Sequence, residues 1–296
     1  MQSVVIPVIK SQGIKTKLVQ WINDIITLSG KDKNVNWIEP FFGTGVVGLN
    51  TEIKGTRIIG DTNPYIIKLY NDIYTGEVTK ERMREFLEAE GKKLASAGND
   101  GYDYFREVRK RFNETHSSYD FVFLSRSGFN GMMRFNGKGE WNVPFCKNPE
   151  RFSQAYITKI CNLLEKTIYT VRKYDWKFYN QHFLKTIAEA KEGDFIYCDP
   201  PYFGRYTNYF NNWTEDDEKE LFDALSNTKA NFIMSTWHHD DFRKNEMIDK
   251  YWDKFNISLH DHFYYNGSTA ERRHSVVEAL IFNFDLKHES ISHELF

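Results

Sequence analysis

The sequence has few cysteines, and the three that it has lie far apart. Cys146, Cys161 and Cys198 form no CxxC pair, so we expect neither a structural zinc site nor a disulfide framework, and a reducing compartment is indicated. Long apolar runs are also missing. No stretch approaches the roughly 20 residues that a membrane span needs, and the opening MQSVVIPVIK lacks the pattern of a signal peptide. These absences predict a cytoplasmic protein with no membrane partner.

The chain also lacks an excess of charge of either sign. Its formal net charge is -2, from 39 basic and 41 acidic residues, which neither favours nor excludes a nucleic-acid partner. Acidic residues gather at 215–220, whereas basic and aromatic residues gather at 126–138. This asymmetry allows one basic face on a nearly neutral molecule. A length of 296 residues with 41% hydrophobic content fits one large domain, or a core domain with a sizeable insertion.

Short apolar runs alternate with helix-like segments near both ends of the chain. The runs are bounded by Gly, Pro or Asp, as buried parallel strands are. This alternation predicts an α/β domain with a largely parallel sheet. Two later strand-like runs predict an antiparallel hairpin at the sheet edge. The strand candidates are 35–38, 57–60, 194–198 and 231–235, and the hairpin candidates are 255–265 and 275–284.

Helix signals flank these runs and dominate the middle of the chain. Thr16–Leu28 has helical apolar spacing, and Thr214 is a candidate N-cap of a later helix with Asp217 in a capping-box position. Two charged helices are expected at 79–96 and 104–113. We therefore predict a catalytic domain formed by residues 1–75 and 181–296, interrupted by a mostly helical insertion at 76–180.

A glycine turn follows the first predicted strand. Gly43 and Gly45 permit a tight turn and a close approach of the backbone to a ligand. A helix beginning near Val46 would offer free N–H groups to that ligand. No Gly-Lys-Ser/Thr follows, so this is not a Walker phosphate loop. The GxGxxG spacing that Gly48 completes is a weak signal alone, because such a turn is often only a sharp connection.

Two acids lie near this turn in the predicted sheet. Asp61 ends the second strand, where an acid can accept hydrogen bonds from ribose hydroxyls. Taken alone, a solvated turn residue is the commoner interpretation. Together with the glycine turn, Asp61 predicts an adenosine-type ligand at the carboxyl edge of the sheet. Glu39 lies near the same edge, and an acidic pocket suits a cationic ligand better than a pyrophosphate.

The strand at 194–198 ends in Asp199-Pro200-Pro201-Tyr202. Two prolines stop the strand and hold the Pro200 carbonyl rigidly beside the Asp199 carboxylate. Two fixed acceptors match an amino group with two hydrogens, and the Tyr202 ring matches a planar partner. Although a stiff turn is the simpler interpretation, this arrangement is the one expected for gripping the exocyclic amine of a nucleobase.

These motifs, in this order, resemble the alpha group of adenine-N6 DNA methyltransferases, and the chain is similar in particular to the DNA adenine methylase branch over nearly its whole length. The N-terminal motif departs from the family's usual Lys-Trp-Ala-Gly-Gly-Lys, because Ser11 stands where a tryptophan is expected to lie over the cofactor. The matching blocks are 39–45, 60–63, 199–202, Arg109 with 112–113, 126–131, 134–136 and 140–145.

The resemblance implies a Rossmann-like S-adenosylmethionine-dependent methyltransferase sheet with a target-recognition insertion. It implies methyl transfer to N6 of a flipped-out adenine in double-stranded DNA, at a GATC-like site, in a bacterial or phage-infected cell. Catalysis falls to Asp199, Pro200 and Tyr202. The expected cofactor-binding residues are Ser11, Lys15, Glu39, Phe41, Gly43, Gly45, Asp61 and Asp199. The expected DNA-binding residues are Lys10, Arg126, Asn130, Met132, Arg134, Asn136 and Pro144.

Some of these residues have a more specific expected role. Arg134 is a candidate for a bidentate contact to guanine, and Lys10, Arg126 and Lys138 are candidates for phosphate contacts; a solvated face is an equally good interpretation of any single one. No metal site is expected. The run at 238–240, His-His-Asp, has no further ligand at zinc spacing and is interpreted as a polar loop near the flipped base.

Other functions stay open at this point. An RNA or protein-amide methyltransferase would use the same tetrapeptide, but usually lacks a recognition block like that at 126–145. A cytosine-N4 methyltransferase more often carries Ser in place of Asp199. A DNA-binding protein without catalysis is a third alternative, against which the intact motifs argue. A restriction endonuclease acting separately, a solitary or phage-borne role and the oligomeric state are all left open by the sequence.

Overall fold

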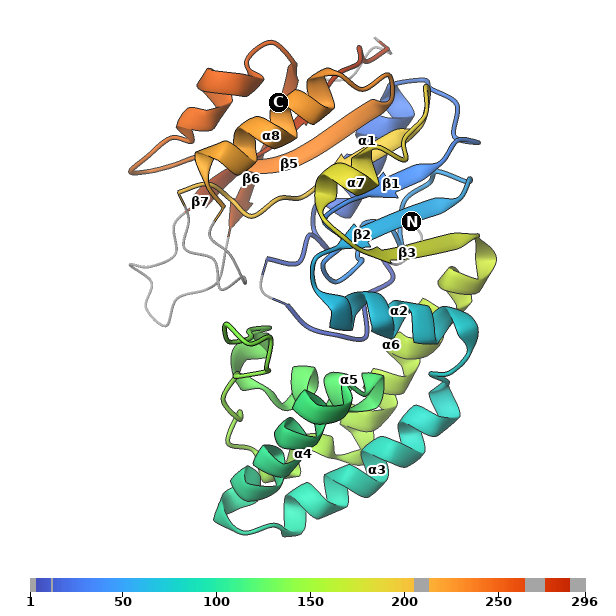
Figure 1. Ribbon diagram of the computed structural model, residues 1–296, viewed down its shortest axis with the longest axis vertical. Helices are drawn as coiled ribbons and strands as arrows, with labels where there is room; N and C mark the ends of the chain where they lie inside the picture. Colours follow the sequence, from blue (N-terminus) through green and yellow to red (C-terminus); the bar gives the residue numbers. More distant parts are fainter. Residues whose placement is uncertain (1–3, 12, 205–212, 264–274, 288–296) are drawn as a thin grey trace.

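A computed structural model describes residues 4–11, 13–204, 213–263 and 275–287 (Figure 1). Within these ranges the strands form one seven-stranded sheet in the order β3-β2-β1-β4-β5-β7-β6. The strands are β1 (Trp37–Glu39), β2 (Arg57–Asp61), β3 (Trp176–Asn180), β4 (Phe195–Cys198), β5 (Asn231–Asp240), β6 (Asn256–Phe263) and β7 (Ser275–Phe282).

The direction of the strands confirms the predicted sheet. β1 pairs in parallel with β2 and β4, and parallel pairing continues outward to β3 and β5. β7 runs antiparallel between β5 and β6, which makes the expected hairpin at one edge. The chain builds the sheet outward from β1 on one side and from β4 on the other. The carboxyl ends of β1 and β4 therefore form a topological switch point, the usual ligand site of open α/β sheets.

β3 is a strand that is not predicted from the sequence. Residues 176–180 were assigned to the helical insertion, but they pair with β2 along its full length, from Arg57 opposite Trp176 to Asp61 opposite Asn180. β3 lies at the sheet edge and buries only its first residue. It therefore lacks the continuous apolar run that marks a central parallel strand. The helical insertion ends before it, with α6.

Helices cover both faces of the sheet (Figure 1). On one face, Ile38, Ile58 and Ile196 share a buried cluster with α7 (Phe183–Ile187) and α8 (Glu215–Ser226). On the other face, Trp37 and Ile59 pack in a second cluster with α1 (Val19–Leu28) and α2 (Pro64–Thr75). Successive strand residues point to opposite faces. Burial on both faces explains why consecutive residues of these strands, such as Trp37 and Ile38, are both apolar.

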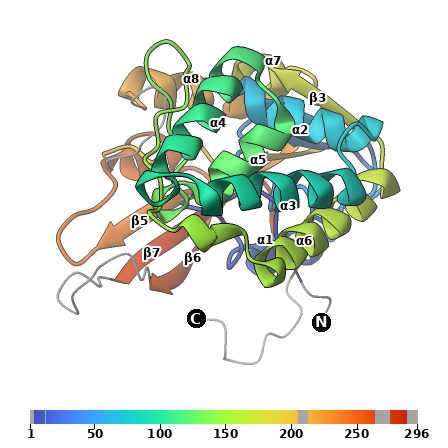
Figure 2. The ribbon, with the colours of Figure 1, turned by 90° about the horizontal axis from the view of Figure 1, so that it is seen from below.

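The insertion is a helical lobe that lies below the sheet in Figure 1 and in front of it in Figure 2. The predicted apolar face of its second long helix is confirmed, because Phe105, Val108 and Phe112 are all buried. The lobe contains α3 (Lys80–Ser96), α4 (Tyr102–Thr115), α5 (Ser118–Ser127) and α6 (Gln154–Lys173), with the short turns η1 (Asn99–Gly101), η2 (Phe129–Gly131) and η3 (Pro149–Phe152). A further one-turn segment, η4 (Ile248–Trp252), packs on α8.

Two helix predictions have opposite outcomes. The capping box at Thr214 is confirmed, since its hydroxyl accepts from the Asp217 N–H and the Asp217 carboxylate accepts from the Thr214 N–H. The prediction of a helix beginning near Val46 is wrong, because residues 46–50 form successive turns. The reason is Arg57, whose buried guanidinium donates to the Gly48 carbonyl within these turns and to the Ile53 and Gly55 carbonyls in the connection that follows. Carbonyls turned towards this side chain cannot continue a helical ladder.

The first helix begins at Val19 rather than Thr16, and residues 16–18 make turns before it. Of the helices within the described ranges, none combines the length and the apolar character that a membrane crossing requires.

Candidate active site

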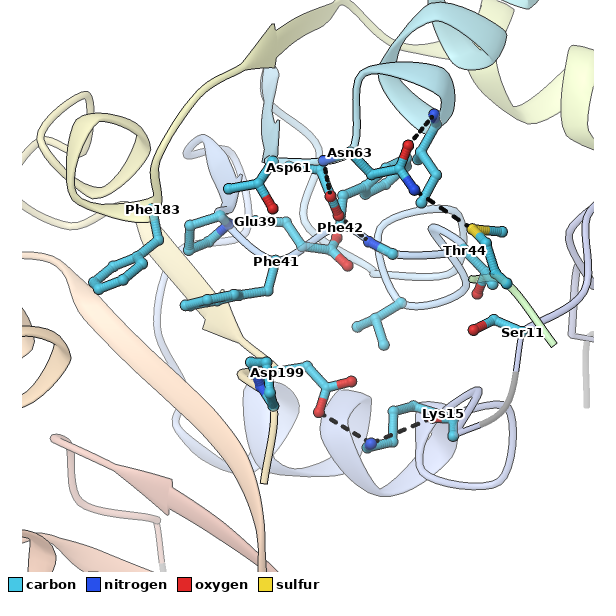
Figure 3. Close-up of a pocket in the computed structure, with 18 of the residues that line it drawn as sticks. Ser11, Lys15, Glu39, Phe41, Phe42, Thr44, Asp61, Asn63, Phe183 and Asp199 are labelled. Atoms are coloured by element: carbon cyan, nitrogen blue, oxygen red, sulfur yellow. Dashed lines mark hydrogen bonds and ion pairs between the residues drawn. The ribbon is translucent and has the colours of Figure 1, made fainter. Parts of the chain in front are cut away.

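A pocket opens at the switch point, between the carboxyl ends of β1, β2 and β4 (Figure 3). Its walls come from the N-terminal segment, the glycine turn, the end of β2 and the start of the Asp-Pro-Pro-Tyr corner. Gly45 lies between two lining residues, Thr44 and Val46. The fold thus brings together residues that the sequence analysis assigned to the cofactor: Ser11, Lys15, Glu39, Phe41, Gly43, Asp61 and Asp199 all line this pocket.

The glycine turn needs glycine at both of its first two positions. Gly43 and Gly45 have φ values of 52° and 79°, in the left-handed region that favours glycine. A Cβ at Gly45 would also lie 2.4 Å from the ring of Phe42. The hydroxyl of Tyr70 donates to the carbonyl of Thr44 and holds the turn from below.

Asp61 ties the turn to the second strand. Its Oδ2 accepts from the Gly43 N–H at 2.7 Å, and its Oδ1 accepts from the Asn63 N–H at 2.7 Å. Burial raises the pKa of Asp61, and these two hydrogen bonds oppose the shift. Because each carboxylate oxygen has a second lone pair, Asp61 can hold the turn and accept a hydroxyl from a ligand as well.

Glu39 places a buried carboxyl group in the floor of the pocket. Its exposed fraction is 1%, and burial raises its pKa to about 8, opposed by the Trp37 indole N–H and reinforced by the charge of Asp199. The Trp37 Nε1 donates to Glu39 Oε2 at 2.8 Å. A Cβ at Gly48 would lie 2.5 Å from the same oxygen. The third glycine of the turn therefore makes room for this carboxyl group.

Three aromatic rings form a corner of the pocket. Phe41 lies 5.1 Å from Phe183 and 5.6 Å from Trp213, measured between ring centroids. The Trp213 Nε1 donates to Glu218 at 2.6 Å, which fixes the indole. Of these three rings, only Phe41 is predicted from the sequence. Phe183 is the first residue of α7, and Trp213 precedes α8 on the same face of the sheet. No local motif marks either residue.

Asp199 follows β4 and faces the pocket with a side chain that is 23% exposed. Lys15 Nζ lies 3.0 Å from its Oδ1 (Figure 3), and the Ser235 hydroxyl donates to the same oxygen at 2.8 Å. Burial raises the pKa of Asp199, and Lys15 and Ser235 oppose that shift. Ser235 is not predicted from the sequence, and it reaches Asp199 because β5 pairs directly with β4.

Tyr202 lies between a cation and a buried acid. Lys15 Nζ is 4.5 Å from the centroid of its ring, and its hydroxyl donates to Oε2 of Glu278 at 2.6 Å. Glu278 comes from β7 and has an exposed fraction of 0%. This acid is not predicted from the sequence either, since nothing in a strand of apolar residues indicates where its one carboxylate points.

Several of the residues predicted to contact DNA gather at one end of the insertion. Asn130 and Pro144 are exposed, and Met132 is half-buried. The Phe129 N–H donates to the Pro144 carbonyl at 2.9 Å, which joins the two short segments. Lys10 reaches this region from the N-terminus. Its side chain lies so close to Gly131 that a Cβ there would be 3.2 Å from it.

Arg134 and Asn136 are held by their neighbours. Arg134 Nε donates to the Asn142 side-chain oxygen at 2.9 Å, and Nη2 donates to the Asn142 carbonyl at 3.1 Å. The Asn136 side-chain oxygen accepts from the N–H groups of Lys138 and Glu140. Asn136 therefore builds the turn that carries Lys138, while Asn142 orients the guanidinium of Arg134.

Arg126 does not have the exposed position that the predicted phosphate contact requires. Its exposed fraction is 3%. Its Nε donates to the Val8 carbonyl at 2.6 Å and its Nη2 to the Pro7 carbonyl at 3.1 Å. Burial lowers its pKa. Because every residue of α5 except Tyr119 is buried, the guanidinium points inward and fastens the N-terminal segment to the insertion.

The His-His-Asp run at 238–240 is also different from the expectation of a polar loop. These residues form the end of β5, where His239 bridges to Lys244 in a short hairpin. The two imidazoles contact each other through Nδ1 atoms 2.7 Å apart. Among the residues that the structure describes, no group of three or more His, Cys, Asp or Glu side chains could hold a metal ion.

The strand order, the acidic and aromatic pocket at the switch point and the Asp-Pro-Pro-Tyr corner together define a methyltransferase of the α/β class. The family described as D12 class N6 adenine-specific DNA methyltransferase matches residues 11–265, and the chain belongs to this family. It is therefore an enzyme that methylates adenine in DNA at N6.

Curated relatives carry related names. The chain is 30% identical to the DNA adenine methylase of Vibrio cholerae serotype O1 over 203 residues, which cover 64% of this chain and 67% of the relative. It is 31% identical to the DNA adenine methylase of Escherichia coli (strain K12) over 56% of this chain and 55% of the relative. The modification methylase StsI of Streptococcus sanguinis is 27% identical over 93% of this chain and 42% of the relative.

Proposed function

We propose that this enzyme takes its methyl group from S-adenosylmethionine and delivers it to an adenine flipped out of double-stranded DNA, with Asp199 and the Pro200 carbonyl holding the reacting amine. The observation that carries the proposal is the position of Asp199. Its carboxylate faces the same pocket as Glu39 and Asp61, next to an aromatic ring at Tyr202, so one site offers a place for a cationic nucleoside and for a planar amine.

The pocket suits S-adenosylmethionine group by group. A buried carboxyl with a pKa of about 8, Glu39, is stabilised in its ionised form by a cation. Asp61 ends β2, where an acid can accept from ribose hydroxyls, and the ring corner at Phe41 suits a purine. When bound, S-adenosylmethionine supplies an electrophilic methyl group on a sulfonium centre.

The tetrapeptide prepares the amine. The N6 lone pair of adenine is delocalised into the purine and is a poor nucleophile. Hydrogen bonds from its two N6 hydrogens to Asp199 and the Pro200 carbonyl favour a pyramidal nitrogen and free the lone pair. Lys15 and Ser235 keep the Asp199 carboxylate ionised and oriented. Orientation of this kind can contribute roughly 7–11 kcal/mol to a barrier reduction.

The end of the insertion takes the DNA. Flipping the base costs about a few kcal/mol, and the 48% exposed Phe129 with its neighbours Asn130 and Met132 offers side chains to fill the vacated stack. Arg134, held by Asn142, is the candidate for a guanine contact. Lys10 is a candidate for a phosphate. The resemblance to the DNA adenine methylase branch makes a GATC-like site the first to test.

The proposal is tested by incubating the protein with radiolabelled S-adenosylmethionine and mixed-sequence duplex DNA, followed by base-resolved mapping of N6-methyladenine. We expect modified adenine within one short recognition sequence. Duplex RNA and protein substrates run in parallel test the alternatives. Transfer of the label to RNA or protein, with none transferred to DNA, would overturn the proposal.

Substitution of Asp199 tests the assigned role. Asp199→Ala should abolish transfer while DNA binding is retained, and the isosteric Asp199→Asn separates the loss of charge from the loss of volume. Substantial methylation by Asp199→Ala would exclude Asp199 as the group that holds the amine.

A further inference from the structure

Three consecutive residues after the prolines are each held by a side chain from another strand or hairpin. The Tyr202 hydroxyl donates to Glu278 Oε2 at 2.6 Å. The Phe203 carbonyl accepts from the Trp237 Nε1 at 3.0 Å, and the Gly204 carbonyl accepts from Arg243 Nη1 at 2.6 Å. Of these contacts, only the first holds a side chain with a proposed role in the reaction.

We propose that Glu278 is a positioning residue for methyl transfer: its buried carboxylate, through the hydroxyl of Tyr202, fixes the aromatic ring in the orientation that receives the adenine. This inference rests on the function proposed above, in which Tyr202 stacks on the target base. Glu278 orients the adenine through Tyr202 and has no assigned contact with substrate or cofactor.

The place of Glu278 in the sheet argues against a role in the sheet itself. It lies in the middle of β7, opposite Trp237 of β5 and His260 of β6, and its exposed fraction is 0%. Its neighbours on the same face of β7, Val276 and Leu280, are buried apolar residues. Burying a carboxylate is costly unless it is hydrogen-bonded, so an apolar residue would serve the sheet better.

The direction of the side chain supplies the reason for a carboxylate. Glu278 lies on the same face as Ser235, because Ser235 pairs with Leu280 and Trp237 with Glu278 in the β5–β7 register. Ser235 holds Asp199. Two polar side chains of neighbouring strands therefore support the two functional side chains of the tetrapeptide, Ser235 under the acid and Glu278 under the ring. In line with this closeness, the charge of Glu278 contributes to the raised pKa of Asp199.

A phenol hydrogen-bonded to a carboxylate differs from one bonded to water in two ways. The short contact restricts the ring's rotation about its side-chain torsions, so less ordering is left for the moment when a base stacks on it. The negative partner also makes the ring richer in electrons, which strengthens its attraction for a cation over its face. Lys15 Nζ lies over that ring at 4.5 Å. Glu278 is thus linked to the cation beside Asp199 as well as to the ring.

The test is a double-mutant cycle on the full-length protein, with Glu278→Leu, Tyr202→Phe and the double variant. Steady-state kinetics are measured on duplex DNA that contains the mapped site. We expect each single substitution to lower kcat about tenfold or more for its loss of orientation, with the dissociation constant of S-adenosylmethionine changed much less. The double variant should lose no more than the worse single variant. Losses that multiply would show that the two groups act separately and would overturn the inference.

Glu278→Gln is the matched control for the loss of charge. Its side-chain oxygen still accepts from the phenol, so kcat should fall far less than in Glu278→Leu. The acid limb of its pH–rate profile should move to lower pH, because a charge that raises the pKa of Asp199 is gone. A merely structural role would instead change thermal stability in step with activity. Tyr202→Phe leaves Glu278 in place and stays informative if Glu278→Leu fails to fold.

Failure of this inference is distinguishable from failure of the proposed function. If the wild type does not methylate DNA, or Asp199→Ala stays active, the proposed function is wrong. If the wild type methylates DNA, Asp199→Ala is inactive, and both Glu278→Leu and Tyr202→Phe keep full kcat, only the role of Glu278 is refuted.

Discussion

The ammonium group of Lys15 lies 3.0 Å from a carboxylate oxygen of Asp199. The two residues lie far apart in the sequence, and the N-terminal segment reaches the tetrapeptide because Arg126 fastens the carbonyls of Pro7 and Val8 to the insertion. Lys15 is buried, so solvent screens this ion pair less than it would a surface pair. The charge of Lys15 is the first of the effects that oppose the raised pKa of Asp199.

Replacing Lys15 should therefore change the pH dependence of methylation. Burial raises the pKa of Asp199 and Lys15 lowers it, so Lys15→Met should raise that pKa further. Only the ionised carboxylate can both accept a hydrogen bond from the amine and stabilise the positive charge that develops on it. Activity is therefore lost as pH falls through the pKa of Asp199. The acid limb of the kcat profile should move to higher pH, which is measured by initial rates across that limb.

Two further variants calibrate this shift. Ser235→Ala removes a second group that lowers the pKa of Asp199, so its acid limb should move in the same direction. Lys17→Met removes an exposed lysine of the same segment and should leave the limb in place. A limb that moves to lower pH in Lys15→Met would contradict the assigned ion pair.

Glu39→Gln should change how stability depends on pH. The pKa of Glu39 rises from an ordinary 4.5 to about 8 in the folded protein. Between these values the folded state keeps a proton that the unfolded state gives up, so the free energy of unfolding falls as pH rises through that window. Glu39→Gln lacks this titrating group, so its free energy of unfolding should depend less on pH. Urea titrations at a series of pH values measure this dependence.

Ligand binding gives the same carboxyl group a second readout. A cation bound beside Glu39 favours its ionised form, so S-adenosylmethionine should bind with release of a proton at pH values below about 8. Calorimetry in two buffers of different ionisation enthalpy measures that release. It should vanish in Glu39→Gln and persist in Glu192→Gln, which alters an exposed acid. Equal proton release in wild type and Glu39→Gln would place the cation elsewhere.

Much of the sheet could be predicted because the signals for it are local. The apolar runs of β1, β2, β4 and β5 are buried on both faces, and the capping box at Thr214 is complete within four residues. β3 could not be predicted because an edge strand buries few of its side chains and therefore lacks a continuous apolar run. The helix expected near Val46 failed because Arg57, a residue of the next strand, takes the carbonyls that a helix would need.

The site residues show the same difference between local signals and contacts that depend on distant parts of the chain. Residues within continuous motifs, such as Gly43, Asp61 and Asp199, could be placed at one edge from strand ends alone. Ser235 and Glu278 could not, because they reach the tetrapeptide only through the register of β4, β5 and β7. Arg126 belongs to a matching motif, yet a motif cannot tell an inward guanidinium from an outward one.

Arg126→Ala should therefore destabilise the protein rather than weaken a phosphate contact. It leaves the buried carbonyls of Pro7 and Val8 without their donors, at a cost of about 1–3 kcal/mol for an unsatisfied buried group. Urea denaturation measures the loss. Lys138→Ala is the counterpart, because Lys138 is exposed. It should leave stability unchanged and reduce the salt dependence of DNA binding by about one phosphate. A fully stable Arg126→Ala protein with a reduced salt slope would reverse this assignment.

Arg134 and Asn142 should act together in reading one base pair. Asn142 binds Nε and Nη2 of the guanidinium, which fixes the plane in which Arg134 can meet a guanine. Arg134→Ala should cost about 1–3 kcal/mol in discrimination at one position of the site. Competition methylation of oligonucleotides that differ at single positions measures this.

Asn142→Ala keeps the arginine but removes the bond to its Nε, so it should relax the same position to a smaller extent and leave the others unchanged. Its effect should disappear when Arg134 is already Ala, because Asn142 then has no guanidinium to orient. An equal loss of binding on all sequences, as expected for Lys138→Ala, would make Arg134 a phosphate contact instead. Relaxation at two different positions by the two variants would show that Asn142 contacts a base by itself.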